Sequence, residues 1–250
     1  MEKRERILLI GDSLGFARPA HDQLFEQAWP AIVKERLPTF DIWQRCRPTA
    51  TILDVSAEFG LFSDFADQFS GFVIQVGITD CCPRPYPFWM QRLIRSYTGS
   101  SFQRWIGKHY PLLLKFRSRP WIPKKRYEAS MCAMIDQIKK INPSASVGII
   151  VIADAGSKFI DKVAGIQEAI DAYNQLLADI ESRYQCKGNV SLINPFSHVD
   201  CQSLLLPDGH HLTVEGHAEV AQAVIAFLGK SSDHLSGSAK VSSVSSTVLQ

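Results

Sequence analysis

The chain has 250 residues, of which 46% are hydrophobic, enough for one large α/β domain with a substantial core. Its apolar runs are too short for a signal-peptide core or a membrane span, and the six cysteines show no Cys-x-x-Cys spacing. Two of the cysteines are adjacent, which argues against a zinc site and against an ordered disulfide framework. We therefore expect a reduced, cytoplasmic chain.

The formal charge of +2 is distributed very unevenly along the chain. Residues 81–127 hold eleven Lys or Arg and no Asp or Glu. The remainder holds sixteen basic and twenty-five acidic residues, a net charge of −9. A strongly basic segment therefore interrupts an acidic body.

Apolar runs and helical patterns alternate along the chain. Strands are predicted at 7–10, 40–44, 72–76, 147–152 and 190–193, and helices at 21–37, 51–69, 126–141, 161–184 and 214–228, with Pro30 as a kink or a fresh first turn. This alternation predicts a three-layer, flavodoxin-like α/β sandwich with a mostly parallel five-stranded sheet. A helical insertion at about 83–127 interrupts it, the domain is expected to span 1–229, and the Ser-rich stretch 230–250 is expected to be disordered.

Residues whose side chains could take part in catalysis follow the predicted strands. Ser13 comes three residues after the first apolar run, and Asp80 follows the run at 72–76. In open parallel sheets, ligands bind beyond the carboxyl ends of the strands. Asp208 and His211 lie about two hundred residues after Ser13, so one sheet could assemble a Ser-His-Asp nucleophile system.

Three short blocks resemble the SGNH, or GDSL, hydrolase superfamily over roughly residues 6–229. They are Gly11-Asp12-Ser13-Leu14, Gly77-Ile78-Thr79-Asp80 and Asp208-Gly209-His210-His211. The resemblance implies Ser13 as nucleophile, His211 as general base and Asp208 as the carboxylate that orients the imidazole, with no cofactor. A serine hydroxyl needs such a base because it is almost never ionised at neutral pH. The plain alternatives are a serine in a polar turn and a surface or helix-capping histidine.

The second block departs from the family pattern at the expected oxyanion hole. Thr79 stands where the family has an asparagine, and the segment 47–50 (Arg-Pro-Thr-Ala) stands where it has a glycine. Gly77, Thr79, Asp80 and Arg84 form the candidate oxyanion and substrate-binding set. A donor could come from the Thr79 hydroxyl or from the Arg84 guanidinium, whereas Arg84 could instead brace the rim through a salt bridge to Asp80.

Other polar residues near these blocks are predicted to be structural. The carboxylates of Asp12 and Asp80 are expected to cap nearby N–H groups. Cys81 and Cys82 are expected to be small buried residues, because no further His-bearing motif accompanies them.

The last block contains additional histidines. His210 and His217 are expected to be structural. The cluster of Asp208, His210, His211 and His217 could suggest a metal site, but the Asp-x-x-His spacing already has an explanation, so no metal is predicted.

The basic insertion carries ten aromatic residues through Tyr127. It indicates either an anionic partner, such as an acidic or lipid-linked glycan, a phosphate or a lipid surface, or a helical lid with solvated charges. Nucleic acid is not expected, because no binding motif accompanies the charge. The block 77–84 is similar to that of SGNH proteins of bacterial surface-polysaccharide assembly, which implies a cytoplasmic enzyme, with peripheral contact at the inner face of the membrane through 83–127.

These observations support three hypotheses for function. The first is a serine esterase that removes an acyl group from a carbohydrate-linked ester. The second is an acyltransferase that moves the group to a sugar through the same acyl-enzyme. The third is a glycan-binding protein whose catalysis has decayed, which the altered oxyanion positions favour and the Ser-His-Asp set opposes.

Overall fold

The computed structural model describes residues 4–86, 90, 105, 108–110, 112–114, 118–185 and 189–244. Five parallel strands form the central sheet in the spatial order β2-β1-β3-β6-β7. They are β1 (Arg6–Gly11), β2 (Asp41–Cys46), β3 (Phe69–Gln75), β6 (Ser146–Ile150) and β7 (Val190–Ile193). Numbered within this sheet alone, the order is 2-1-3-4-5, which is the flavodoxin-like arrangement. The predicted fold class and all five predicted strands are confirmed.

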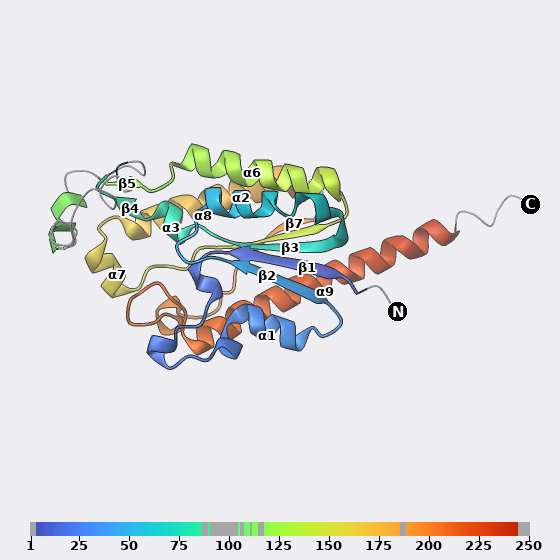
Figure 1. Cartoon of the computed structure of the whole chain (residues 1–250), viewed down its shortest axis with the longest axis horizontal. Helices are drawn as coiled ribbons and strands as arrows, with labels where there is room; N and C mark the ends of the chain where they lie inside the picture. The colour runs from blue at the N-terminus through green and yellow to red at the C-terminus, as the bar shows by residue number, and fades with distance from the viewer. Residues whose placement is uncertain are drawn as a thin grey trace, which may run out of the picture.

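Helices cover both faces of the sheet (Figure 1). One face carries α1 (Trp29–Arg36) and α9 (Val214–Val244), and the other carries α2 (Ile52–Gly60), α6 (Lys124–Ile141) and α8 (Ile166–Tyr184). Two short helices, α3 (Ile78–Cys81) and α7 (Ser157–Lys162), lie at one end of the sheet. The molecule is therefore a three-layer sandwich with the sheet in the middle.

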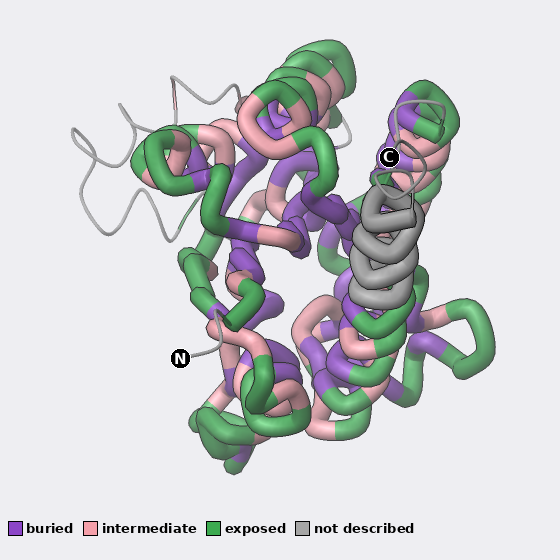
Figure 2. Tube along the Cα trace, turned by 90° about the vertical axis from the view of Figure 1, so that its right-hand side faces the viewer, coloured by how far each residue is buried: buried purple, intermediate pink, exposed green. Residues whose placement is uncertain are grey.

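Side chains of strand β1 alternate between two cores. Leu8 and Ile10 belong to the core shared with α2, α6 and α8, whereas Ile7 and Leu9 belong to the core shared with α1 and α9. Successive residues of a strand point to opposite faces, so a strand covered on both sides must be apolar throughout. Buried segments accordingly gather in the interior, between helices whose outer sides are exposed (Figure 2).

Three predicted helices are interrupted where the backbone turns. The stretch predicted as 21–37 forms two 3-10 turns, Pro19–His21 and Phe25–Gln27, before α1 begins with Pro30 in its first turn. The stretch predicted as 161–184 is divided into α7 and α8 by Gly165, whose φ of +79° is left-handed. The pattern at 51–69 gives α2 followed by the 3-10 turn Ser63–Gln68.

The last helix extends into the C-terminal region. Helix α9 continues to Val244 and projects beyond the body of the molecule (Figure 1). Once a helix has nucleated, each further residue adds a hydrogen bond at little cost, and residues 230–244 contain no proline that would end it. The expected domain boundary at residue 229 and the expected disorder of 230–250 stay predictions.

The ends of the basic insertion lie together. Strand β4 (Pro83–Arg84) pairs antiparallel with β5 (Arg119–Pro120), so the insertion leaves and rejoins the domain at one place. Most of the predicted helical insertion lies outside the described residues. Within the described part of the chain, no helix is long and apolar enough to cross a membrane.

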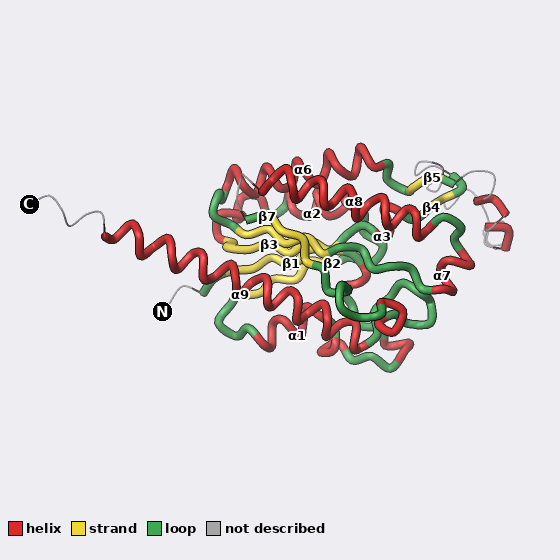
Figure 3. The backbone as a smooth tube through the Cα atoms, turned by 180° about the vertical axis from the view of Figure 1, so that it is seen from behind, coloured by secondary structure: helices red, strands yellow, loops and turns green. Residues whose placement is uncertain are grey.

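The strand order changes direction between β1 and β3. Strand β1 pairs with β2 on one side and with β3 on the other, and the chain leaves all of these strands at the same end of the sheet. Loops gather at this end (Figure 3). The crevice beyond the carboxyl ends of β1 and β3 is thus the expected ligand site of this fold.

Candidate active site

Ser13 lies directly beyond the end of β1 and begins the 3-10 turn Ser13–Gly15. The preceding Asp12 accepts a hydrogen bond from the Leu14 N–H at 2.9 Å and caps this turn. A Cβ at Gly11 would approach the Gln75 carbonyl oxygen to 2.5 Å, so only glycine permits this approach between β1 and β3. The Gly-Asp-Ser sequence therefore presents the Ser13 hydroxyl at the rim of the sheet.

The structure brings the three predicted catalytic side chains into one hydrogen-bonded chain. The Ser13 hydroxyl oxygen lies 3.4 Å from Nε2 of His211, and Nδ1 of His211 lies 2.6 Å from Oδ2 of Asp208. The other carboxylate oxygen, Oδ1 of Asp208, accepts the backbone N–H groups of His211 and His210. This is the arrangement in which a carboxylate orients an imidazole and the imidazole takes a serine proton.

A tight loop holds Asp208 and His211 in position. The Leu206 N–H donates to the His211 carbonyl at 2.7 Å, and the Gly209 N–H donates to the Leu206 carbonyl at 2.8 Å. Gly209 has a φ of +79°, and a Cβ there would lie 2.9 Å from Phe159. The sharp turn therefore requires glycine between the acid and the base.

The site favours a neutral imidazole and an ionised carboxylate. Burial and the adjacent His210 lower the pKa of His211 to about 4, although the bond to Asp208 opposes this shift. Burial would raise the pKa of Asp208, but hydrogen bonds from the side chain and backbone of His211 outweigh it and hold the pKa well below its usual range. At neutral pH, His211 is thus in the form that accepts a proton.

Arg18 is part of the site and was missed by the sequence analysis. Its Nη2 is hydrogen-bonded to Nε2 of His211 and lies 3.5 Å from the Ser13 carbonyl oxygen. A guanidinium only donates, so Nε2 must accept and the proton of neutral His211 must be on Nδ1, facing Asp208. An arginine five residues after the serine has no recognisable sequence pattern, and only the fold of residues 13–23 places it on the histidine.

Asp12 and Asp80 have the structural roles that were predicted for them. Both are fully buried, and Oδ1 of Asp80 accepts the Ile52 N–H at 2.9 Å, which caps α2 from a neighbouring element. Burial raises the pKa of each carboxyl to about 7, and each retains one oxygen without a hydrogen-bond partner among the described residues. Neither contacts the Ser13 hydroxyl.

Three backbone N–H groups near Ser13 are candidates for an oxyanion hole. Ser13 begins a 3-10 turn and Thr79 is the second residue of α3, and the first N–H groups of such turns have no intrahelical acceptor. Thr49, in the segment where the family has a glycine, has a φ of +58° and lines the same pocket. Among the described residues, no group accepts a hydrogen bond from these three N–H groups. The backbone of Thr49 thus adopts a conformation that glycine favours, although its side chain differs.

Gly77 shapes this part of the site. Its φ is +146°, and a Cβ there would lie 2.5 Å from the Ile152 side chain. The residue lies two positions beyond the end of β3 and is the N-cap of α3, which carries Thr79 to the pocket. Gly77 therefore contributes to the site through its backbone conformation, which positions α3.

Arg84 lies in the pocket without the predicted salt bridge. Its Nη1 is 3.3 Å from the Tyr110 hydroxyl, and its guanidinium lies over the Trp121 ring at 5.2 Å from the centroid. Asp80 is occupied by the α2 cap, and no described carboxylate pairs with Arg84. The alternative that Arg84 braces the rim through Asp80 is wrong.

A pocket of about 460 Å³ surrounds Ser13. Its described lining combines apolar side chains with five that are basic or imidazole: Ser13, Arg18, Pro48, Thr49, Ile78, Thr79, Cys82, Arg84, Tyr110, Phe159, Lys162, Val163, His210 and His211. None of these described lining residues is acidic. The pocket is therefore electropositive.

The remaining histidines have packing roles, as predicted. His210 stacks on the Phe159 ring at 4.7 Å between centroids, and its ring lies 4.0 Å from that of His211. His217 is buried in α9, where its Nδ1 accepts the Trp29 N–H at 3.3 Å. These contacts join the last loop and helix to the body.

Asp208, His210 and His211 are the described residues whose arrangement could hold a metal, because their ligand atoms lie within 4.8 Å of one another. However, both ring nitrogens of His211 already have partners, Asp208 on one side and Ser13 or Arg18 on the other. The cluster is thus better suited to proton transfer than to a metal.

Cys81 and Cys82 are buried, and burial raises the pKa of both thiols. A thiol with a raised pKa is a poor nucleophile at neutral pH. Both belong to the core shared with α2, α6 and α8, and Cys82 also lines the pocket as a small side chain.

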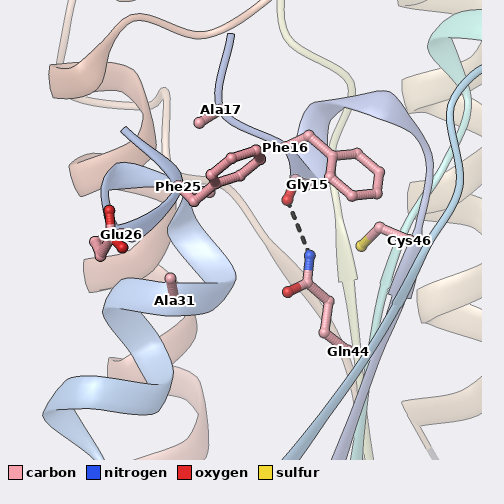
Figure 4. A pocket seen from close by; sticks show the side chains of 9 residues that line it. Gly15, Phe16, Ala17, Phe25, Glu26, Ala31, Gln44 and Cys46 are labelled. Atoms are coloured by element: carbon pink, nitrogen blue, oxygen red, sulfur yellow. Dashed lines mark hydrogen bonds between the residues drawn. The ribbon is translucent and has the colours of Figure 1, made fainter. Parts of the chain in front are cut away.

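A second hollow lies behind the segment that follows Ser13 (Figure 4). There the Gln44 side chain donates to the Gly15 carbonyl at 3.1 Å, and a Cβ at Gly15 would overlap Cys46. This hollow shares no described lining residue with the Ser13 pocket. Its contacts fix the backbone that presents the serine.

Fold and site together define an α/β protein of the doubly wound class with a serine, histidine and aspartate chain at its switch point. The chain has the fold of the GDSL lipolytic proteins. It superposes on a member of the lipolytic protein G-D-S-L family from Veillonella parvula DSM 2008 with a TM-score of 0.57 and 10% identity, covering 89% of this chain and 97% of that one. No protein-family model and no curated protein matches the chain.

Two further solved structures share this fold. A lipase/acylhydrolase from Enterococcus faecalis gives a TM-score of 0.60 at 15% identity, covering 89% of this chain and 94% of that one. A carbohydrate acetylesterase family member from Sinorhizobium meliloti gives 0.57 at 14%, covering 91% and 98%. The whole domain is thus shared, whereas little of the sequence is.

Proposed function

We propose that the protein is a serine esterase or acylhydrolase of the SGNH type. The observation that carries the proposal is the hydrogen-bonded chain of Ser13, His211 and Asp208 at the carboxyl ends of the strands. The acylhydrolase and acetylesterase named among the structures of the same fold support it.

The chemistry follows from the geometry. Nε2 of His211 takes the Ser13 proton while the Ser13 oxygen attacks the ester carbonyl, and the resulting imidazolium is stabilised by Asp208. The backbone N–H groups of Ser13, Thr49 and Thr79 are the donors available to the oxyanion. His211 then protonates the leaving alcohol, and a water deprotonated by His211 releases the acid from Ser13.

An acyl ester of a carbohydrate is the substrate class we favour. It is the class named by the acetylesterase of the same fold, and the pocket is large enough for a monosaccharide ester. Residues of the basic insertion, including Tyr110, reach this pocket, so the insertion contributes to substrate choice.

The test is covalent labelling by a fluorophosphonate probe, with Ser13→Ala and His211→Ala as controls and peptide mapping of the adduct. Labelling at Ser13 that requires His211 is expected. Acetylated monosaccharides are then offered with and without an acceptor sugar, which separates hydrolysis from transfer to a hydroxyl. No labelling and no turnover would refute the proposal.

The contact between Arg18 and His211 favours a second candidate, a glycan-binding protein without turnover. The guanidinium occupies the Nε2 lone pair that general base catalysis needs. This candidate predicts glycan binding that survives Ser13→Ala, with no probe labelling of the parent protein.

A further inference from the structure

Three cations from separate elements converge on the Ser13 pocket. Arg18 comes from the loop after β1, Arg84 from β4 and Lys162 from the end of α7. Within the described part of the chain, no carboxylate forms an ion pair with any of them. Like charges brought together without a counter-charge favour an anionic ligand.

Buried donors in the same pocket also lack acceptors. The Nε atoms of Arg18 and Arg84 are buried and have no hydrogen-bond partner among the described residues. Leaving a buried charged donor unpaired costs free energy, which a ligand offering acceptor oxygens would recover. Phosphate and carboxylate groups match the planar guanidinium best.

Arg18 also competes with Ser13 for one lone pair. Nε2 of His211 has a single acceptor site, which faces both the Arg18 guanidinium and the Ser13 hydroxyl. The serine contact is long at 3.4 Å. Full base function therefore requires that Arg18 find another acceptor.

We propose that the ester hydrolysed at Ser13 carries a phosphate or carboxylate group, and that this anion draws Arg18 away from His211. The inference rests on the proposed esterase function. The anionic group accepts the Arg18 hydrogen bonds, with Arg84 and Lys162 contributing charge. Nε2 of His211 is then free to take the Ser13 proton, so an anionic substrate completes the catalytic arrangement and a neutral one does not.

The experiment compares matched aryl acetates. Methyl 4-acetoxybenzoate is the neutral ester, 4-acetoxybenzoate carries a carboxylate, and 4-acetoxyphenyl phosphate carries a phosphate. Each kcat/KM is divided by the rate of hydroxide hydrolysis of that ester, which removes differences in leaving-group reactivity. Equilibrium binding of the same three esters to Ser13→Ala, which keeps the cations, is measured separately from turnover.

We expect the wild-type protein to prefer at least one anionic ester by about 10–100-fold, the worth of a charge-assisted hydrogen bond. In Arg18→Gln, turnover of the neutral ester is expected to rise, because Nε2 is released, while the anionic preference falls. Lys162→Gln is expected to lower the preference for anionic esters. Lys158→Gln, an exposed lysine on the same helix that does not line the pocket, is the matched control and should match wild type.

The outcomes separate this inference from the esterase proposal. Equal normalised turnover of all three esters, or equal binding to Ser13→Ala, would overturn the anion inference and leave the esterase intact. A parallel fall for neutral and anionic esters in Arg18→Gln would show that Arg18 is only structural. Selective binding of anions without turnover or probe labelling would support the anion site and refute the esterase. Preference for one anionic ester over the other would identify the source of the charge.

Discussion

At the scale of single residues, the site depends on which proton each group holds. Asp208 accepts three hydrogen bonds from residues 210 and 211. Burial, the adjacent His210 and the positively charged Arg18 lower the pKa of His211 and keep it neutral. In the proposed mechanism, the Ser13 hydroxyl oxygen is the nucleophile of this hydrogen-bonded set. Each of the three groups therefore has a role that an isosteric substitution can remove without removing the fold.

Asp208→Asn is expected to lower kcat strongly while leaving folding intact. The asparagine can still accept the backbone N–H groups, but its amide would favour the wrong tautomer of His211. The corresponding change in the serine-protease triad lowers kcat by about 10⁴-fold, and a loss of about 10³–10⁴ is expected here. Steady-state kinetics together with thermal unfolding would check it, and activity within a factor of two of wild type would contradict the triad.

The pH profile of kcat/KM should show an acid limb near pH 4, well below the usual histidine value. The base must be neutral, and the pKa of His211 is lowered to about 4 by burial, His210 and Arg18, so activity is lost only as the pH falls through that value. In Arg18→Gln, loss of a nearby positive charge should move the limb upward. A limb near 6.5 in both proteins would contradict this electrostatic description.

At the scale of elements, the ends of the strands are joined to helices by buried polar caps. Asp12 caps the turn that carries Ser13, and Asp80 caps α2 across the switch point. These carboxylates accept the N–H groups that have no backbone partner at the beginning of a helix. Because the carboxyls are buried, the free energy of unfolding depends on whether they are protonated.

Asp80→Asn should change how stability depends on pH. The folded pKa is raised to about 7, so the folded state binds more protons than the unfolded chain, and the wild type loses stability as the pH rises from about 4 to 7. The asparagine keeps an acceptor for Ile52 but does not ionise, so its advantage over wild type should reach on the order of 2–4 kcal/mol above pH 7. Urea unfolding at pH 4.5 and 8 would measure it.

Asp80→Ala is the matched control for this experiment. It removes both the carboxyl and the acceptor for the Ile52 N–H, so it should destabilise the protein at both pH values. Equal stability of Asp80→Asn and wild type at pH 8 would show that the buried carboxyl carries no penalty.

At the scale of the whole molecule, helix α9 extends beyond the packed α/β domain. Leu228 is buried in the core shared with α1, whereas the rest of α9 projects beyond the body (Figure 1). A helix that does not pack on a core adds little to the stability of the domain.

Deletion of residues 231–250 is therefore expected to leave the melting temperature and the Ser13 labelling within experimental error of the full chain. Deletion from residue 224 onward removes Val224 and Leu228, both buried, and should lower the melting temperature by many degrees. Calorimetry of both truncated proteins beside the full chain would check this, and equal losses in the two would contradict the boundary.

The periodicity of apolar residues was sufficient to predict the layers of the fold. The sequence motifs were sufficient to select Ser13 and His211 as candidate site residues. The run at 7–10 is apolar at every position, and the run at 72–76 is apolar at every position except Gln75, because both faces of an interior parallel strand are covered. This local pattern can be recognised without knowledge of the neighbouring strands. The left-handed turn at Gly165, in contrast, was not anticipated, because glycine is also tolerated inside a helix.

The sequence by itself determined the order of strands and helices, the block that carries Ser13, and the pairing of Asp208 with His211, because all of these are local in the chain. Only the tertiary structure decided that Arg18 is hydrogen-bonded to His211 and that Arg84 contacts Tyr110 rather than Asp80. It also decided that Thr49 has a left-handed backbone conformation and that three cations line one pocket. These facts depend on side chains from separate elements meeting at the switch point, and no spacing in the sequence encodes a distance between elements that only packing brings together.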